Sequence, residues 1–234
     1  MAKSKSPAYP RVPPPVEEPK VYSDEVKDFA ATFLLGEEYV QNMSEKDRAL
    51  YRLIRPLPGS LYSESLMLCS IHEYFERHRQ SVASLGGKVE LNPDFQRGHV
   101  WNKDQKVAFI EAILRGTAPM KVIFNSLSYR DSRLGGDIPE YDFVCVDGLQ
   151  RITAVMEFVR GEFRIFGDTM SYEELDGTSF SFKRTRFKFD LYIYAFNRRK
   201  DLLDFYVTLN SGGTVHTKEE LDRVRALIAE SEKK

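Results

Sequence analysis

The chain has 234 residues, of which 42% are hydrophobic and 29% charged, with 34 Lys plus Arg against 35 Asp plus Glu. This composition is typical of a globular protein, and the near-zero net charge means that any contact with nucleic acid must depend on a local basic patch. Cys69 and Cys145 lack the CxxC spacing of a zinc site, no apolar run reaches the roughly 18 residues of a membrane span, and the start lacks a signal-peptide core. We therefore expect a cytoplasmic protein that has no membrane partner.

The N-terminal part is predicted to have no sheet. Residues 1–22 hold six of the eleven prolines and little that could pack, which predicts a flexible Pro-rich arm or a tail that docks a partner. Residues 23–85 are predicted to form a helical N-terminal extension. Apolar residues recur at helical spacing in VKDFAATFLL, in KDRALYRLI after Ser44 as an N-cap, and in ESLMLCSIHEYFERH from Glu64.

Residues 86–234 alternate between strand and helix patterns, which predicts an α+β or mixed α/β core with helices attached before and after it. Two helices are expected to end at glycines, Gly116 and Gly161, and Thr217 with Glu220 is spaced as a capping box for the last helix. The expected strands are KVEL, MKVIFNS, YDFVCV and FDLYIYAF, and the expected helices are KDQKVAFIEAILRG, LQRITAVMEFVRG, RKDLLDFYVTLN and KEELDRVRALIAE.

The stretch VDGLQR (Val146 to Arg151) lies where a buried strand is predicted to pass into a helix. This position places Asp147 at the carboxyl end of a strand, where open sheets bind ligands, and Gly148 lets the backbone turn closely. The free N–H groups of the helix start and the Arg151 guanidinium would suit a phosphate, and Asp147 could hold a divalent metal or orient water. The alternative is that Asp147 caps the helix while Arg151 pairs with a surface carboxylate.

A second Gln-Arg pair, Gln96 and Arg97, occurs in NPDFQRGHVW (Asn92 to Trp101). This segment is rich in polar groups that would be costly to bury without partners, so the second pair is predicted to face the first across one pocket. The alternative is that Arg97 pairs with Asp94 or Asp104 while the aromatic residues fill the core.

A basic stretch follows in SFSFKRTRFKFD (Ser179 to Asp190). In an extended conformation its phenylalanines would alternate with basic residues, which would project together toward phosphate. Such a surface would suit DNA contact through Lys183, Arg184, Arg186 and Lys188, whereas the pattern is equally typical of a solvated strand edge protected by charge.

NPDFQRGHVW, VDGLQR and FYVTLNSGGTVHTKEEL resemble, in order and spacing, the N-terminal domain of GmrSD-type restriction endonucleases. That domain belongs to the ParB/sulfiredoxin-like superfamily, and the similarity covers roughly Glu64 to Glu230. Its most diagnostic element is the Asp-Gly-x-Gln-Arg signature joined to Gln-Arg-x-x-x-Trp. The resemblance implies a small mixed β-sheet core that binds and hydrolyses nucleoside triphosphates in defence against modified DNA.

The resemblance also implies site residues. Asp147 and Arg151 correspond to catalytic positions, and Asp147 also corresponds to the ligand of Mg²⁺ or Mn²⁺ carried by the nucleoside triphosphate. The implied nucleotide-binding residues are Gln96, Arg97, Gly148, Gln150, Asn210 and Gly213. Leu149 stands where the family most often has glutamine, which implies one polar contact fewer.

Two hypotheses follow for function. The first is a nucleotide-hydrolysing enzyme that acts on DNA or is regulated with it, in a restriction or anti-restriction setting, with a phage or mobile element among the sources. The chain ends one helix after NSGGTVHT, so a self-contained HNH nuclease is not expected, whereas nicking by the ParB-like domain itself stays open. The second is a non-catalytic inhibitor or adaptor that binds a protein partner or a second copy.

Overall fold

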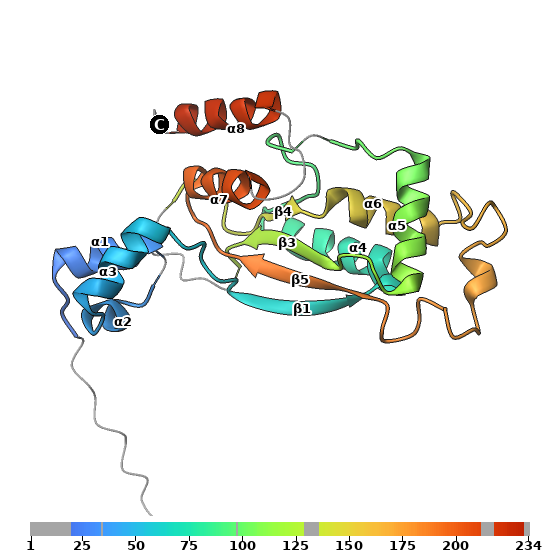
Figure 1. Ribbon diagram of the computed structural model, residues 1–234, viewed down its shortest axis with the longest axis horizontal. Coiled ribbons are helices and arrows are strands. Elements are labelled where there is room, and N and C mark those ends of the chain that lie inside the picture. The colour runs from blue at the N-terminus through green and yellow to red at the C-terminus, as the bar shows by residue number, and fades with distance from the viewer. Residues whose placement is uncertain (1–19, 34, 97, 129–135, 212–217, 232–234) are drawn as a thin grey trace, which may run out of the picture. The chain divides into compact units, whose positions relative to one another are not determined.

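The computed structural model describes residues 20–33, 35–96, 98–128, 136–211 and 218–231, and it divides the chain into two compact units, Met1–Pro58 and Gly59–Lys234. Figure 1 shows the helices and strands along the chain. In chain order they are α1 (Asp24–Phe33), α2 (Glu37–Gln41), α3 (Glu45–Ile54), β1 (Tyr62–Met67), η1 (Leu68–Ser70), α4 (Ile71–Ala83), β2 (Val89–Glu90), α5 (Lys103–Arg115), β3 (Lys121–Ser126), β4 (Phe143–Asp147), α6 (Leu149–Val159), η3 (Glu173–Leu175), β5 (Lys188–Tyr194), α7 (Arg199–Ser211) and α8 (Lys218–Ser231).

The smaller unit contains α1, α2 and α3, which bury Val26, Phe29, Ala30 and Val40. The predicted N-cap of α3 is confirmed, because the Ser44 side chain accepts a hydrogen bond from the Asp47 backbone N–H. The helical part of the N-terminal prediction is therefore confirmed for these residues, whereas the predicted boundary near residue 85 is wrong.

The boundary is wrong because a strand stands where the third helix was predicted to begin. Residues 62–67 form β1, which pairs antiparallel with β5 from Tyr62 opposite Ile193 to Met67 opposite Lys188, and α4 begins only at Ile71. A hydrogen-bonded ladder to a distant strand overrides the local helical period here. β1 and α4 thus belong to the larger unit.

The larger unit is built on a mixed five-stranded sheet in the order β1-β5-β3-β4-β2. The β1/β5 and β3/β4 pairs are antiparallel, whereas β5/β3 and β4/β2 are parallel. The predicted α+β class, with a small mixed sheet and helices at both ends, is confirmed. Within the described residues, every helix is too short or too polar to cross a membrane.

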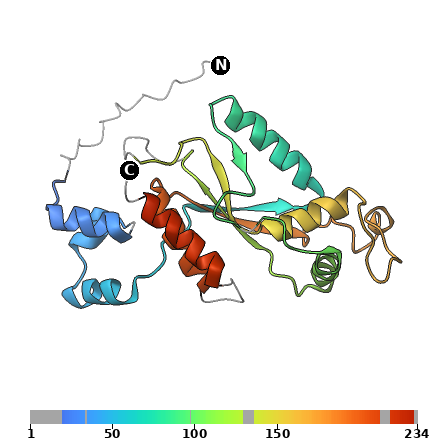
Figure 2. The same ribbon diagram turned by 90° about the horizontal axis from the view of Figure 1, so that it is seen from above.

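Two groups of buried side chains pack on the sheet. Alternate residues of β3 separate them, since Val122 and Phe124 pack with α4, α5 and α6, whereas Ile123 packs with α7 and α8. In Figure 2, α4 and α8 lie on opposite sides of the strands. Helices therefore cover both faces of the sheet and pack against β3 and β4.

Local residues set the ends of α5. Gly116 ends this helix in the left-handed region at φ 77°, as predicted, and Asn102 and Gln105 form a capping box at its start that was not predicted. At the other helix, Gly148 is the N-cap of α6 with φ 122°. A Cβ built on Gly148 would lie 2.6 Å from Val122 Cγ1, so both the backbone conformation and the contact require glycine.

The segment before β5 departs from the prediction. Residues 182–187 form turns and bends, and the strand begins only at Lys188. Phe182 and Phe187 are both buried in the core beside α6, and a straight strand could not bring them there together with the alternating basic residues exposed. The extended conformation expected for this basic stretch is therefore wrong.

Gly148→Ala should lower the free energy of unfolding by about 2 to 4 kcal/mol, because alanine adds left-handed strain and overlaps Val122. Gly116→Ala is the matched control, since Gly116 also has positive φ but a Cβ there would meet nothing within 4 Å. That control should lose only about 1 kcal/mol. Urea unfolding of both variants measures the difference, and equal losses would contradict the role of the Val122 contact.

Candidate functional site

The turn between β4 and α6 places the signature residues at one point. β4 ends at Asp147, Gly148 carries the chain through the turn, and Arg151 lies in the first turn of α6. The Arg151 Nη2 donates a hydrogen bond to the Asp147 Oδ2, and the two residues form an ion pair. Arg151 therefore does pair with a carboxylate, as the alternative reading allowed, but with the one inside its own signature.

The two partners differ in their access to solvent. The Asp147 side chain is 40% exposed, whereas that of Arg151 is 13% exposed. A half-exposed carboxylate can be reached by a ligand or a cation, while the guanidinium is held mostly within the protein. An anion that enters beside them would compete with Asp147 for the guanidinium.

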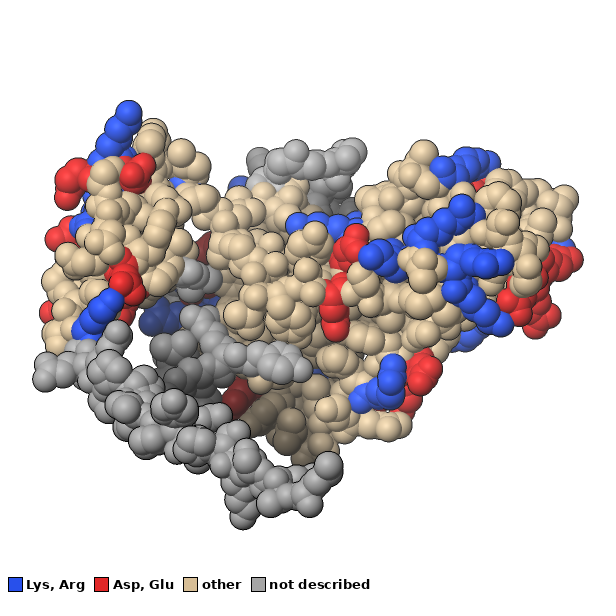
Figure 3. All heavy atoms as spheres, turned by 90° about the horizontal axis from the view of Figure 1, so that it is seen from below, with Lys and Arg blue, Asp and Glu red and all other residues tan. Residues whose placement is uncertain are grey.

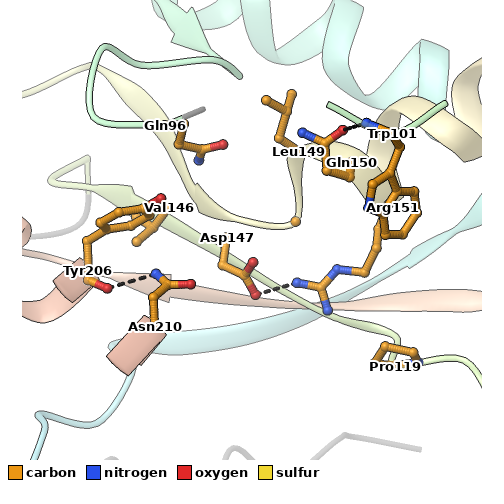
Figure 4. Close-up of a pocket in the computed structure, with 11 residues that line it drawn as sticks. Gln96, Trp101, Pro119, Val146, Asp147, Leu149, Gln150, Arg151, Tyr206 and Asn210 are labelled. Atoms are coloured by element: carbon orange, nitrogen blue, oxygen red, sulfur yellow. Dashed lines mark hydrogen bonds and ion pairs between the residues drawn. The ribbon is translucent and has the colours of Figure 1, made fainter. Parts of the chain in front are cut away.

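Asp147 and Arg151 line a pocket with a volume of about 390 Å³, which lies within the usual range for small-molecule sites. Figure 4 shows the two side chains and the pocket residues around them. The other lining residues are Gln96, Trp101, Pro119, Val146, Gly148, Leu149, Gln150, Tyr206 and Asn210. The pocket thus joins the signature to the upstream Gln-Arg segment and to α7.

The upstream segment is attached to the sheet and to the C-terminal helices. The Gln96 Nε2 donates to the Cys145 carbonyl over 2.8 Å, and Arg223 of α8 donates to the Gln96 carbonyl over 2.6 Å. Asp94 pairs with Arg199 of α7 through Nη2 distances of 2.7 and 2.6 Å. The partner of Asp94 is therefore Arg199, and Arg97 lies outside the described residues.

Gln150 uses its amide to hold the backbone of the same segment. Its Oε1 accepts hydrogen bonds from the N–H groups of Val100 and Trp101, both over 3.1 Å, and its Nε2 donates to the Gly98 carbonyl. Both acceptor directions of the amide oxygen are thus occupied. The expected contact between Gln150 and nucleotide stays a prediction, and only its second N–H remains for such a contact.

Leu149 does not act as the sequence suggested. It contributes to the pocket wall, but the residue is only 3% exposed and belongs to the core group with α4 and α5. Figure 4 shows its side chain directed away from Asp147. The expectation that leucine leaves the pocket one polar contact short is therefore corrected, because this side chain faces the core.

Cys145 lies beneath the site without access to it. Burial raises the pKa of its thiol to about 12, although hydrogen bonding from Gln96 acts in the opposite direction. A thiol held so firmly in its neutral form is a poor nucleophile. Thiol chemistry of the sulfiredoxin kind therefore has no support at this position.

Asp147 is the one carboxylate among the described residues that line the pocket. Among the residues that the structure describes, no group of three or more His, Cys, Asp or Glu side chains could hold a metal ion. Asp147 fits a cation that takes its remaining ligands from phosphate oxygens and water, which is the usual mode for Mg²⁺ beside nucleotides.

Asn210 lines the pocket as predicted from the resemblance, whereas Gly213 lies outside the described residues. Sequence reasoning missed Tyr206, which stands one helical turn before Asn210 and whose carbonyl accepts a hydrogen bond from the Asn210 Nδ2 over 2.7 Å. The spacing of four residues in α7 was the signal that could have found it. Trp101 belongs to the diagnostic Gln-Arg-x-x-x-Trp element but was not predicted as a site residue, although it lines the pocket.

Each predicted DNA-binding side chain has a partner within the protein. Lys183 pairs with Asp176 over 2.7 Å, and Lys188 donates to the Ser65 hydroxyl over 3.0 Å. Arg184 and Arg186 donate to the carbonyls of Thr178 and Ser179. Backbone carbonyls do not neutralise a guanidinium, so these two arginines keep a positive charge for an external anion.

Comparison with known proteins identifies the family. The model of the family described as GmrSD restriction endonuclease, N-terminal domain, matches residues 71–227, which is more than half of the chain. Searches of curated proteins and of solved structures returned no match. The matched residues run from the start of α4 into α8 and include every residue that lines the pocket. The chain therefore belongs to the family of GmrSD restriction endonuclease N-terminal domains.

Proposed function

We propose that the pocket binds a nucleoside triphosphate together with Mg²⁺ or Mn²⁺ and hydrolyses it. Membership in the GmrSD family gives the setting, which is that of restriction endonucleases acting on DNA. The observation that carries the proposal is the convergence of Asp147, Arg151 and the N-terminus of α6 on one pocket. A carboxylate, a guanidinium and a helix start together provide what a metal-bound polyphosphate needs.

Each of these groups has a distinct part. Arg151 would contact phosphate oxygens, and its restricted side chain would lose little conformational freedom on binding. The start of α6 presents the positive end of the helix dipole to the same anion. Asp147 would hold the cation on the phosphates and orient the attacking water, while the cation would polarise the phosphoryl oxygens when bound.

Binding would require the ion pair to open. The Arg151 guanidinium now donates to Asp147, and phosphate oxygens would compete for the same donors. The bonds from Arg151 to carboxylate and to phosphate are both charge-assisted, so the exchange changes the number of such bonds little. It releases the carboxylate for the cation, whose contact with Asp147 and the phosphates would favour the open pair.

DNA contact is proposed for the loop before β5, through Arg184 and Arg186 with Lys183 and Lys188. Figure 3 shows that Lys and Arg side chains gather on one region of the molecule, with Asp and Glu beside them. Arg186 also stacks on Phe187 at 4.6 Å from the ring centroid, which fixes its direction. A mixed surface of this kind suits weak, salt-sensitive contact with the phosphate backbone.

Arg151→Gln should weaken binding of a nucleoside triphosphate roughly tenfold or more, because charge-assisted contacts to phosphate are lost. Arg160→Gln is the matched control, since Arg160 follows the same helix and pairs with Glu162 at the surface. Asp147→Asn should abolish both the increase in affinity caused by Mg²⁺ and the release of phosphate. Calorimetric titration with and without Mg²⁺ measures binding, and unchanged affinity in Arg151→Gln would contradict the proposal.

Leu149→Gln should lower the free energy of unfolding by about 1 to 3 kcal/mol, because an amide would enter an apolar core. It should not raise phosphate release above that of the wild type. Leu149→Met, which conserves volume, should cost less than about 1.5 kcal/mol and serves as control. Faster hydrolysis by a fully stable Leu149→Gln protein would show that the position does face the nucleotide. If wild type, Leu149→Gln and Asp147→Asn all match a blank, the chain is a binding module and not an enzyme.

Reversing the charges of Arg184 and Arg186 to Glu should weaken DNA binding for unrelated sequences alike. The slope of log affinity against log salt should fall by about two, close to one unit for each phosphate contact. The control reverses Arg77 and Arg79 of α4, which are 68% and 47% exposed. Fluorescence anisotropy over a salt series gives both slopes, and circular dichroism checks the loop. Equal slopes for the two double variants would place DNA elsewhere.

A further inference from the structure

Trp101 is the single tryptophan of the chain, and it lines the pocket. Its ring packs against Phe109 of α5 with 5.3 Å between centroids, so one part of the indole is anchored in the core. The residue is nevertheless only partly buried. The pocket thus contains an aromatic surface in addition to its phosphate-binding groups.

The aromatic surface lacks an explanation in phosphate chemistry. Asp147, Arg151 and the helix start account for a polyphosphate and its cation, but an indole offers nothing to a phosphate beyond one N–H group. Flat aromatic faces bind flat rings, and stacking of a nucleobase on a tryptophan is a common and base-tolerant mode of recognition. A pocket of about 390 Å³ also has room for more than three phosphates.

Gln150 holds the backbone of Trp101 through a hydrogen bond. The amide oxygen of Gln150 accepts hydrogen bonds from the N–H groups of Val100 and Trp101, and its nitrogen donates to the Gly98 carbonyl, so one side chain holds the segment at three residues. Figure 4 draws the contact between Gln150 and Trp101. Gly98 has φ 75°, a backbone conformation that residues with a side chain rarely adopt. The hydrogen bond from Gln150 connects Gly98 to α6.

We propose that Gln150 is a positioning residue, and that it holds Trp101 as the surface on which the base of the nucleotide stacks. The inference rests on the proposed function for its ligand, but not for the positioning itself. Gln150 and Arg151 are neighbours in α6, so one helical turn would orient both halves of the ligand. Arg151 would contact the phosphates directly, and Gln150 would set the base through Trp101.

The first test concerns Trp101 without any ligand. Gln150→Met keeps the length of the side chain but loses all three hydrogen bonds, whereas Gln150→Glu keeps the two accepted bonds and loses the donated one. The tryptophan emission maximum should move to longer wavelength, and acrylamide quenching should increase about twofold or more, in Gln150→Met and less in Gln150→Glu. Gln80→Met is the matched control, because Gln80 lies on α4 and, in the described part of the chain, its side chain bonds only to the exposed Glu76. Emission and quenching that stay at wild-type values in both Gln150 variants overturn the positioning role.

The second test separates the base from the phosphates. Wild type should bind a nucleoside triphosphate roughly tenfold more tightly than inorganic triphosphate, with quenching of tryptophan fluorescence only by the nucleotide. Gln150→Met should lose this preference while keeping its affinity for inorganic triphosphate, and Trp101→Leu should do the same. Equal affinity of wild type for both ligands overturns base stacking. If wild type binds neither ligand while the first test succeeds, the proposed function fails and the positioning role stands.

Should Gln150→Met not fold, Trp101→Leu carries the second test alone, because Gln150 bonds to the backbone of residue 101 and not to its side chain. It should lose the preference for the nucleotide, with the affinity for inorganic triphosphate within about twofold of wild type. A loss of affinity for both ligands in equal proportion would mean that the indole supports the phosphate site and not the base, and it would overturn the assignment.

Discussion

The close approach of Gly148 to Val122 constrains the turn on which the candidate site depends. No side chain fits between the two strands at this point, so β4 can pass into α6 directly above β3. Asp147 lies just before that turn, and Gln150 and Arg151 lie just after it. The turn therefore sets the directions of their side chains. A turn that is fixed by packing, and not by loop contacts, gives a polar site the rigid support that preorganised binding requires.

Hydrogen bonds within the protein hold the polar side chains of the pocket. Asp147 bonds to Arg151, Gln96 bonds to the backbone of β4, and the amide of Gln150 bonds to the upstream segment. Such a network leaves few buried donors or acceptors unsatisfied before a ligand arrives, and it limits the cost of keeping charged groups in a partly dry pocket. The polar groups of the site therefore have partners before a ligand arrives, and a polyphosphate would exchange the contact between Asp147 and Arg151 for contacts of its own.

Features that depend on residues near in sequence could be predicted, whereas features that depend on distant residues could not. The β4–α6 turn, the N-cap of α3, the end of α5 at Gly116 and the helical faces depend on neighbours within a few residues, and the pattern of residues indicates them correctly. β1 could not be found in this way, because its ladder partner β5 lies far along the chain. The hydrogen-bond partners of the Gln150 amide could not be predicted for the same reason, since they lie 49 to 52 residues upstream. Leu149 also depends on packing, because only the fold shows that its side chain faces the core.

The pairing of β1 with β5 has a consequence for the order in which the sheet can be assembled. Among the strands that the structure describes, a ribosome produces β1 first, yet its partner β5 is made last. During synthesis the backbone groups of β1 therefore have no ladder to join, and an unpaired edge of this kind invites wrong partners. β5 also pairs with β3, so its arrival connects the waiting strand to the centre of the sheet in one step. The high sequence separation of the β1/β5 pair predicts that this step of sheet assembly is slow, because a long loop must close before the contacts form.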